Sequence, residues 1–236
     1  MGAELLRARG LEGGYGRVQV LWGADIAVHE GETVVLLGAN GAGKTTLLKL
    51  LMGLIRTWRG ELRFLGEDIV HRRTDRRVRA GIAYMSEIGC FPGLTVEENI
   101  RIGGQFMEAA ALRARMAELY GIFPAIAERR GALASSLSGG QRKMLGIAKA
   151  LAGNPRLLIM DEPSAGLSPL FVKEVIRALA GFRGHGLSLL IAEQNVKFLE
   201  LADRVYTLEG GRIGFEGTVE AMHENDALRR AYFGLK

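Results

Sequence analysis

A glycine-rich loop that ends in a lysine and two threonines is the stretch of this sequence best suited to chemistry. Its residues read GANGAGKTT and match the spacing G-x-x-x-x-G-K-[ST], in which backbone N–H groups surround phosphate oxygens. Lys44 supplies a mobile cation for the β- and γ-phosphates of a nucleotide, and the hydroxyl of Thr45 is a suitable ligand for Mg²⁺. We therefore expect the whole loop to bind a nucleotide: Gly38, Ala39, Asn40, Gly41, Ala42, Gly43, Lys44, Thr45 and Thr46.

Two consecutive carboxylates, Asp161 and Glu162, follow the apolar run from Arg156 to Met160. In α/β sheets, ligands bind at the carboxyl ends of strands, where these two side chains would lie. Asp161 can hold Mg²⁺ directly or through water, and Glu162 can orient and deprotonate an attacking water molecule. An ordinary Asp-Glu-Pro turn is the alternative, but together with the glycine-rich loop the pair predicts phosphoryl transfer.

Two further features could contact a nucleotide. Ser138, Gly139, Gly140 and Gln141 open a helix pattern, in which Ser138 can cap the helix and the free N–H groups can attract an anion. Tyr15 lies in a predicted Gly-rich turn and could stack on adenine. The alternative for Tyr15 is an ordinary loop aromatic.

The elements that must position these groups alternate between strand and helix patterns. The apolar run before the glycine-rich loop predicts a strand, and the leucine-rich segment after it predicts a helix. The basic segment 71–79 could touch nucleic acid or lipid headgroups, but we favour a solvated helix face. We expect strands at Glu4–Leu11, Ala24–His29, Thr33–Leu37, Gly60–Leu65, Gly81–Met85, Arg156–Met160, Leu187–Ala192, Val205–Leu208 and Arg212–Phe215.

The segment between Gly93 and Ser136 contains no clear strand pattern and reads as a small helical subdomain inserted in an α/β core. Thr95 is a good N-cap for its first helix, and a second helix is predicted from about Glu108 to Tyr120. Further helices are expected over Phe171–Phe182 and, as a polar tail, from about residue 219.

Composition limits the class of protein. The 236 residues carry 31 basic and 26 acidic side chains, a net charge of +5, which discriminates only weakly among anionic partners. Cys90 is the single cysteine, so an intramolecular disulfide and a thiolate zinc site are excluded. No apolar run approaches the roughly 20 residues that span a bilayer, and the first residues lack the apolar stretch of a signal peptide. We expect a soluble or peripheral protein that acts on membranes only through other chains.

Three motifs in this order resemble the ATP-binding subunits of ABC transporters: GANGAGKTT, LSGGQ at residues 137–141, and LLIMDEP at residues 157–163. The resemblance implies an α/β fold, with a RecA-like P-loop NTPase core, an antiparallel β-subdomain and an inserted helical subdomain. It also implies one ABC ATP-binding domain over residues 1–236. Residues 1–92 and 137–236 would form the core with the β-subdomain, and residues 93–136 the helical subdomain.

The same resemblance implies Mg²⁺-dependent hydrolysis of ATP by two subunits paired head-to-tail. Each ATP would be held by the glycine-rich loop of one chain and the LSGGQ of the other, with Ser138 and the N–H of Gly140 acting in trans on the γ-phosphate. The partners implied are a second ATPase subunit, membrane permease subunits and, indirectly, a solute-binding protein. The location implied is the cytoplasmic face of the membrane.

This sequence departs from the usual pattern of the family at two positions near the γ-phosphate. Glu87 occupies the place of a glutamine in the loop that touches the membrane subunit, and could ligate Mg²⁺ through water or face the partner loop. Gln194 occupies the place of a histidine, so it can donate a hydrogen bond to phosphate or water but cannot titrate near neutral pH. Its structural alternative is to cap the helix that begins near Asn195.

These departures, together with FPGLTVEENI, AEQN and LADRVYTLEGGRI, resemble the LivF-type subunits of branched-chain amino acid importers. That resemblance implies an ATPase that powers branched-chain amino acid uptake, in a homodimer or with a related second subunit. One alternative is the same role for urea, amides or another small solute. A soluble ABC ATPase acting on DNA or ribosomes usually needs two modules or a coiled-coil insertion, so we expect no nucleic-acid partner.

Overall fold

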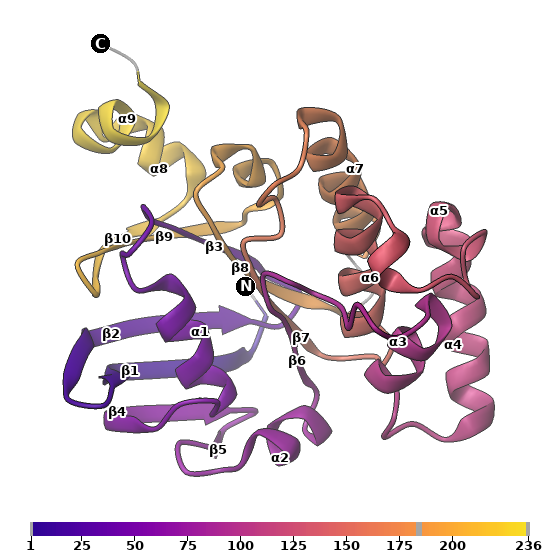
Figure 1. Ribbon diagram of the computed structural model, residues 1–236. Helices are drawn as coiled ribbons and strands as arrows, with labels where there is room; N and C mark the ends of the chain where they lie inside the picture. The colour runs from indigo at the N-terminus through magenta and orange to yellow at the C-terminus, as the bar shows by residue number, and fades with distance from the viewer. Residues whose placement is uncertain (1, 183–185, 235–236) are drawn as a thin grey trace.

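A six-stranded sheet, in the order β10-β9-β3-β8-β7-β6, forms the centre of the molecule (Figure 1). The computed structural model describes residues 2–182 and 186–234, so the two ends of the predicted 1–236 domain lie outside the described residues. Five of the strands run parallel, and β10 is antiparallel to β9. The strands are β3 (Thr33–Leu37), β6 (Ile82–Met85), β7 (Leu157–Asp161), β8 (Ser188–Glu193), β9 (Arg204–Glu209) and β10 (Arg212–Gly217).

A second sheet, antiparallel and in the order β2-β1-β4-β5, packs beside the first. Its strands are β1 (Glu4–Tyr15), β2 (Val18–His29), β4 (Thr57–Phe64) and β5 (Glu67–Asp68). We expected the Gly-rich turn around Tyr15 to span residues 13–16, but Gly13, Gly14 and Tyr15 pair with β2, and the chain turns at Gly16. A Cβ added to Gly14 would lie 2.0 Å from the carbonyl oxygen of Val18. Glycine therefore allows the two strands to approach closely at this position.

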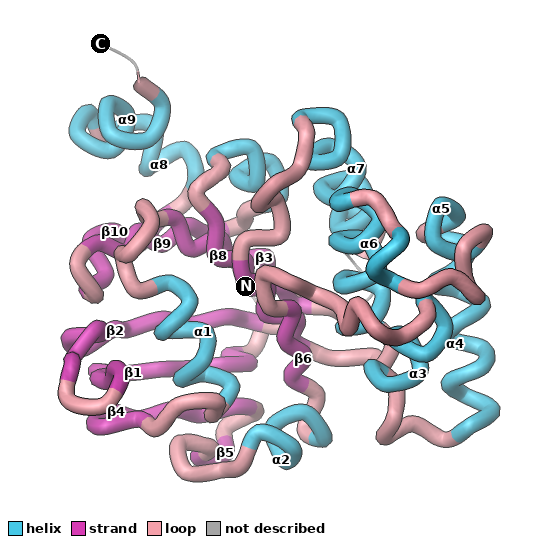
Figure 2. The backbone as a smooth tube through the Cα atoms, viewed as in Figure 1, coloured by secondary structure: helices cyan, strands magenta, loops and turns pink. Residues whose placement is uncertain are grey.

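The helices pack around the central sheet, and those furthest to the right in Figure 2 come from the long segment between β6 and β7. As predicted, the described residues of that segment form no strand, and Thr95 caps its first helix in a capping box with Glu98. The predicted C-terminal tail is helical. The helices are α1 (Lys44–Met52), α2 (Thr74–Arg79), α3 (Val96–Gly103), α4 (Ala109–Ile122), α5 (Pro124–Ala127), η1 (Ala134–Ser136), α6 (Gly139–Leu151), α7 (Pro169–Ala180), η2 (Val196–Leu201), α8 (Val219–Glu224) and α9 (Asp226–Phe233).

Alternate residues of the central strands enter two separate hydrophobic cores. Val34 and Leu36 face the core shared with α1 and the antiparallel sheet. Val35 and Leu37 face the core shared with α3, α4, α6 and α7. Burial on both faces explains why these strands read as continuous apolar runs in the sequence. Among the described residues, no helix has the length and apolar character needed to cross a membrane.

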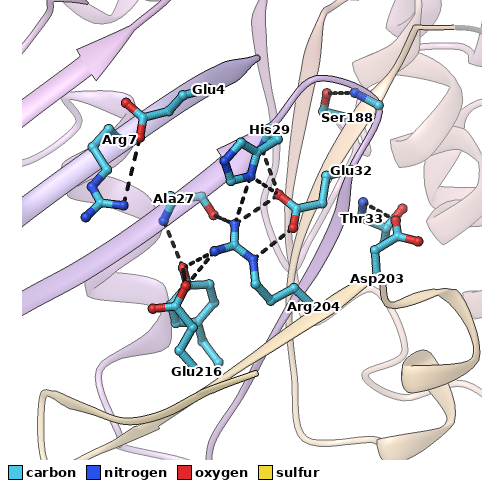
Figure 3. A network of polar contacts seen from close by, with 12 residues as sticks. Glu4, Arg7, Ala27, His29, Glu32, Thr33, Ser188, Asp203, Arg204 and Glu216 are labelled. Atoms are coloured by element: carbon cyan, nitrogen blue, oxygen red, sulfur yellow. Dashed lines mark hydrogen bonds and ion pairs between the residues drawn. The ribbon is translucent and has the colours of Figure 1, made fainter. Parts of the chain in front are cut away.

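Arg204 joins the two sheets at the edge where β3 and β9 begin (Figure 3). Its guanidinium donates to both carboxylate oxygens of Glu32, at 2.8 and 3.0 Å, and to the carbonyl of Ala27 on β2, at 3.0 Å. The hydroxyl of Tyr206 accepts the N–H of Ala27 and donates to Glu216 on β10. These bonds hold the antiparallel sheet against the central one, opposite the edge where the parallel strands end.

The basic segment 71–79 forms the short helix α2 over residues 74–79, and His71, Arg73, Arg76 and Arg79 are exposed, as we predicted for a solvated helix face. Arg77 is the exception, because it is 1% exposed. The guanidinium of Arg77 donates to four backbone carbonyls, those of Leu50, Leu51, Val70 and Arg72. The last carbonyls of a helix have no partner within it, so Arg77 is drawn inward by the end of α1.

Candidate functional site

The glycine-rich loop joins the end of β3 to the start of α1, as the sequence predicted. Gly41 and Gly43 adopt φ values of 80° and 108°, which residues with a side chain rarely reach. Gly43 is the N-cap of α1, and no side chain bonds the first N–H groups of this helix. Those N–H groups and the positive end of the helix dipole therefore remain available for phosphate oxygens.

Lys44 closes the loop upon itself. It is 4% exposed, and its Nζ donates to the carbonyls of Gly38, at 2.7 Å, and Ala39, at 3.1 Å. The same Nζ lies 3.1 Å from Oε1 of Glu162, which forms an ion pair. A cavity of about 320 Å³ opens above these groups, lined by Val20, Asn40, Gly41, Gly43, Lys44, Thr45, Thr46 and Glu162.

Asp161, at the end of β7, shares this site with Thr45. The hydroxyl of Thr45 donates to Oδ1 of Asp161 at 3.0 Å, and the hydroxyl of Tyr84 donates to Oδ2 at 3.1 Å. Asp161 is 3% exposed, and burial raises the pKa of its carboxyl group while both hydrogen bonds lower it. The described residues contain no cluster of three or more acidic, histidine or cysteine ligands. One carboxylate beside one hydroxyl fits Mg²⁺, which takes its other ligands from phosphates and water.

Glu162 follows Asp161 in a left-handed backbone conformation, with φ of 47°. Its N–H donates to the carbonyl of Ala192 at 2.9 Å, which fixes the chain between β7 and β8. A non-glycine residue in this conformation costs on the order of 1–3 kcal/mol and persists only where its surroundings enforce it. The result is a carboxylate at the mouth of the glycine-rich loop.

Gln194, after β8, reaches the same point. Its Nε2 donates to Oδ1 of Asn40 at 2.6 Å and to Oε1 of Glu162 at 3.3 Å. The alternative that Gln194 caps the following helix is wrong, because the side chain of Asn195 accepts the N–H of Lys197 at the start of η2. Gln194 thus joins the phosphate loop to Glu162.

Three predicted contacts lie apart from this cavity in the described chain. Ser138 caps α6 as predicted, and the side chain of Gln141 accepts its N–H, so LSGGQ opens a helix whose first residue is Gly139. The exposed ring of Tyr15 faces Lys49 on α1, with 5.6 Å between the ring centroid and Nζ. Glu87 is exposed, and its backbone carbonyl accepts a hydrogen bond from Nζ of Lys143 at 2.6 Å.

Glu193, the last residue of β8, was not among the residues predicted from the sequence. It is buried, and its Oε1 accepts the N–H of Ser164 at 2.7 Å, while Oε2 accepts the N–H groups of Gln194 and Asn195 at 3.1 and 3.2 Å. Burial raises the pKa of this carboxyl group, and the hydrogen bonds oppose that rise. Glu193 therefore holds the loop after Glu162 against the loop of Gln194. A charged residue at the end of the apolar run 189–192 was the available signal.

A second cavity of about 680 Å³ lies on the other side of the glycine-rich loop. The C-terminal helix α9 forms one wall, through side chains that include Leu228 and Tyr232. Gln194 and residues 38–42 form the opposite wall. The sequence pattern predicted a helical tail but not its position beside this loop.

Known proteins match this chain over nearly its whole length. The sequence pattern of the ABC transporter family matches residues 21–165. The chain is 39% identical to the high-affinity branched-chain amino acid transport ATP-binding protein BraG of Pseudomonas aeruginosa, a match that covers 93% of this chain and 95% of the relative. It is 32% identical to the probable branched-chain amino acid transport ATP-binding protein LivF of Archaeoglobus fulgidus, over 98% of this chain and 99% of the relative.

Another relative has a different named role. The lipopolysaccharide export system ATP-binding protein LptB of Haemophilus influenzae is 34% identical, over 98% of both chains. Among solved structures, an ATP-binding subunit of an ABC transporter is 28% identical and superposes with a TM-score of 0.82, over 98% of this chain and 96% of the other. The motifs, the fold and these relatives agree: the chain belongs to the ABC transporter family, as one of its ATP-binding and ATP-hydrolysing subunits.

Proposed function

We propose that this chain hydrolyses ATP with Glu162 as general base and thereby powers the uptake of branched-chain amino acids. The observation that supports the catalytic part best is the position of the Glu162 carboxylate. Its Oε1 lies 3.1 Å from Nζ of Lys44 and 3.3 Å from Nε2 of Gln194, at the mouth of the phosphate loop. A base at this point can accept a proton from water directed at the γ-phosphate.

The neighbouring residues would bind the nucleotide and orient the attacking water. Lys44 and the N–H groups at the start of α1 hold phosphate oxygens, and the Gln194 amide holds water or the γ-phosphate. Thr45 and Asp161 would hold Mg²⁺, with Glu87 a candidate for a water-mediated contact. The ion, when bound, neutralises charge on the phosphates.

The position of LSGGQ supports a two-chain site. Ser138 and Gly140 open α6, outside the residues that line the cavity of the phosphate loop in their own chain. We propose that they complete the site of a second subunit paired head-to-tail. Within this arrangement residues 93–136 form the helical subdomain, and the loop 86–93 contacts a permease subunit at the cytoplasmic face of the membrane. A solute-binding protein would act only through that permease.

The cargo is proposed from the relatives. The chain is more similar to BraG, at 39% identity, than to LptB, at 34%. Lipopolysaccharide export is the second candidate, because the match to LptB also covers nearly the whole chain. Urea and amides remain alternatives within the importer role.

Glu162→Gln tests the catalytic proposal. The amide keeps the size of the side chain but cannot accept the proton, so turnover should fall by roughly 10²–10⁴-fold while ATP still binds. An ATP-bound dimer should accumulate and elute early in size-exclusion chromatography. The matched control is Glu200→Gln, an exposed carboxylate on η2, which should keep the parental rate. Near-parental turnover by Glu162→Gln would move the base elsewhere.

Deletion of the gene in its source cell tests the cargo. Uptake of radiolabelled leucine should fall and should return with the wild-type chain but not with Glu162→Gln. Lipopolysaccharide at the cell surface is measured in the same cells. Loss of surface lipopolysaccharide with unchanged leucine uptake would establish the export role instead. Loss of urea uptake alone would establish a role in urea import.

A further inference from the structure

One face of α6 lies along the loop 86–93 through residues spaced three apart. Lys143 donates from Nζ to the carbonyl of Glu87 at 2.6 Å. One turn on, Gly146 packs so closely on Gly89 that an added Cβ would lie 2.9 Å from the Cα of Gly89. A further turn on, Nζ of Lys149 lies 4.5 Å from the ring centroid of Phe91. These contacts fix the loop to α6 along about two turns of the helix.

The helix α3 holds the same loop from another side. Oδ1 of Asn99 accepts the N–H of Phe91 at 2.7 Å, and Nδ2 of Asn99 donates to the carbonyl of Phe91 at 3.0 Å. Asn99 is fully buried, so this pair of bonds is shielded from water. The loop 86–93 therefore moves with α3 and α6 rather than independently.

Lys143 differs from the other contacts because it also reaches the catalytic strand end. Its Nζ donates to the backbone carbonyl of Glu162 at 2.9 Å. Lys143 is 7% exposed, so few water molecules can replace either bond. An ammonium group has three N–H donors and no acceptor, which suits it to bridge two carbonyls. One side chain thus joins the loop 86–93 to the strained residue whose carboxylate faces the phosphate loop.

We propose that Lys143 is a positioning residue for hydrolysis, which orients the Glu162 carboxylate by holding the carbonyl groups of Glu87 and Glu162 together. The left-handed backbone of Glu162 needs an enforcing contact, and the bond from Lys143 supplies one on its carbonyl side. A displacement of the loop 86–93 is then transmitted to the general base through this bridge. The inference rests on the proposed role of Glu162 as that base.

Lys143→Met and Lys143→Arg test the bridge, measured as ATPase activity of the purified full-length chain. Methionine fills the space without donors, so turnover at saturating ATP should fall roughly tenfold or more, with the KM for ATP changed by less than about twofold. Arginine keeps a cation and several donors and should restore most of the turnover. Should Lys143→Met fail to fold, Lys143→Gln is measured in its place, with the same split between turnover and KM expected.

Two controls separate positioning from packing. Lys149→Met removes a cation from the same face of α6 without touching Glu162, and should keep the parental basal turnover. Adding Lys143→Met to Glu162→Gln should cause little further loss, because both changes act on the same group. The proposal would be overturned if the losses of turnover in the double variant multiplied. Parental turnover in Lys143→Met would also overturn it. So would an equal fall in turnover in Lys143→Met and Lys143→Arg, accompanied by a lowered melting temperature. High turnover in Glu162→Gln alone would instead refute the assigned base.

Discussion

Replacing Arg77 with methionine removes a buried cation while keeping a long apolar stem. The guanidinium donates to the carbonyls of Leu50 and Leu51 at the end of α1, at 2.9 and 2.6 Å. It also donates to the carbonyls of Val70 and Arg72, at 3.0 and 2.8 Å. Its Cζ packs on the backbone of Gly53, where an added Cβ would come within 2.9 Å. Methionine can replace none of these four bonds.

The expected loss of stability is the difference between two opposing contributions. Hydrogen bonds from a charged donor contribute about 1.5–3 kcal/mol each, so the four bonds at the lower value contribute about 6 kcal/mol. Against this, burial lowers the pKa of Arg77 to about 10, which corresponds to a cost of about 3 kcal/mol for the buried cation. The free energy of unfolding should therefore fall by about 3 kcal/mol, and the melting temperature by about 6–12 °C for a chain of this size.

Thermal unfolding followed by circular dichroism measures this effect on the ligand-free chain. Arg76→Met is the matched control, because Arg76 is the neighbouring residue on α2 and is exposed, so its replacement should change stability by less than about 0.5 kcal/mol. Equal melting temperatures for the two variants would refute the reasoning, since the four carbonyl bonds would then contribute nothing net.

The remaining predictions concern the nucleotide site. Lys44→Ala should abolish productive ATP binding in isothermal titration, because Lys44 is the loop's only cation, and parental binding would refute the site. Tyr15→Ala should weaken ATP binding several-fold, by roughly 1 kcal/mol, at unchanged saturated turnover, and equal affinity would leave Tyr15 with no role in stacking. Gln194→Ala should lower turnover more than ATP affinity, whereas unchanged turnover would remove Gln194 from the mechanism. Gln194→His should stay active and gain a pH dependence near the histidine pKa of about 6.5, absent from the parent.

Much of the site was predictable because its parts are local in the sequence. The loop around Lys44 needs only glycines at fixed spacing between a strand and a helix, and Asp161 needs only to end an apolar strand. Parallel strands bring their carboxyl ends to one edge, so the two motifs were expected to meet. The cap of α6 by Ser138 also depends on residues within one turn.

Tertiary structure alone decided which polar side chains are buried and what they join. Arg77 reads as one more exposed arginine in a basic segment until its carbonyl partners on α1, 26 and 27 residues away, are placed beside it. The bridge from Lys143 joins carbonyls 56 residues before it and 19 residues after it, and Glu193 binds a loop 29 residues earlier. Sequence periodicity records the average polarity around a residue. Whether a polar side chain is buried depends instead on a hydrogen-bonding partner on another element. That partner comes within reach only once the elements have packed together.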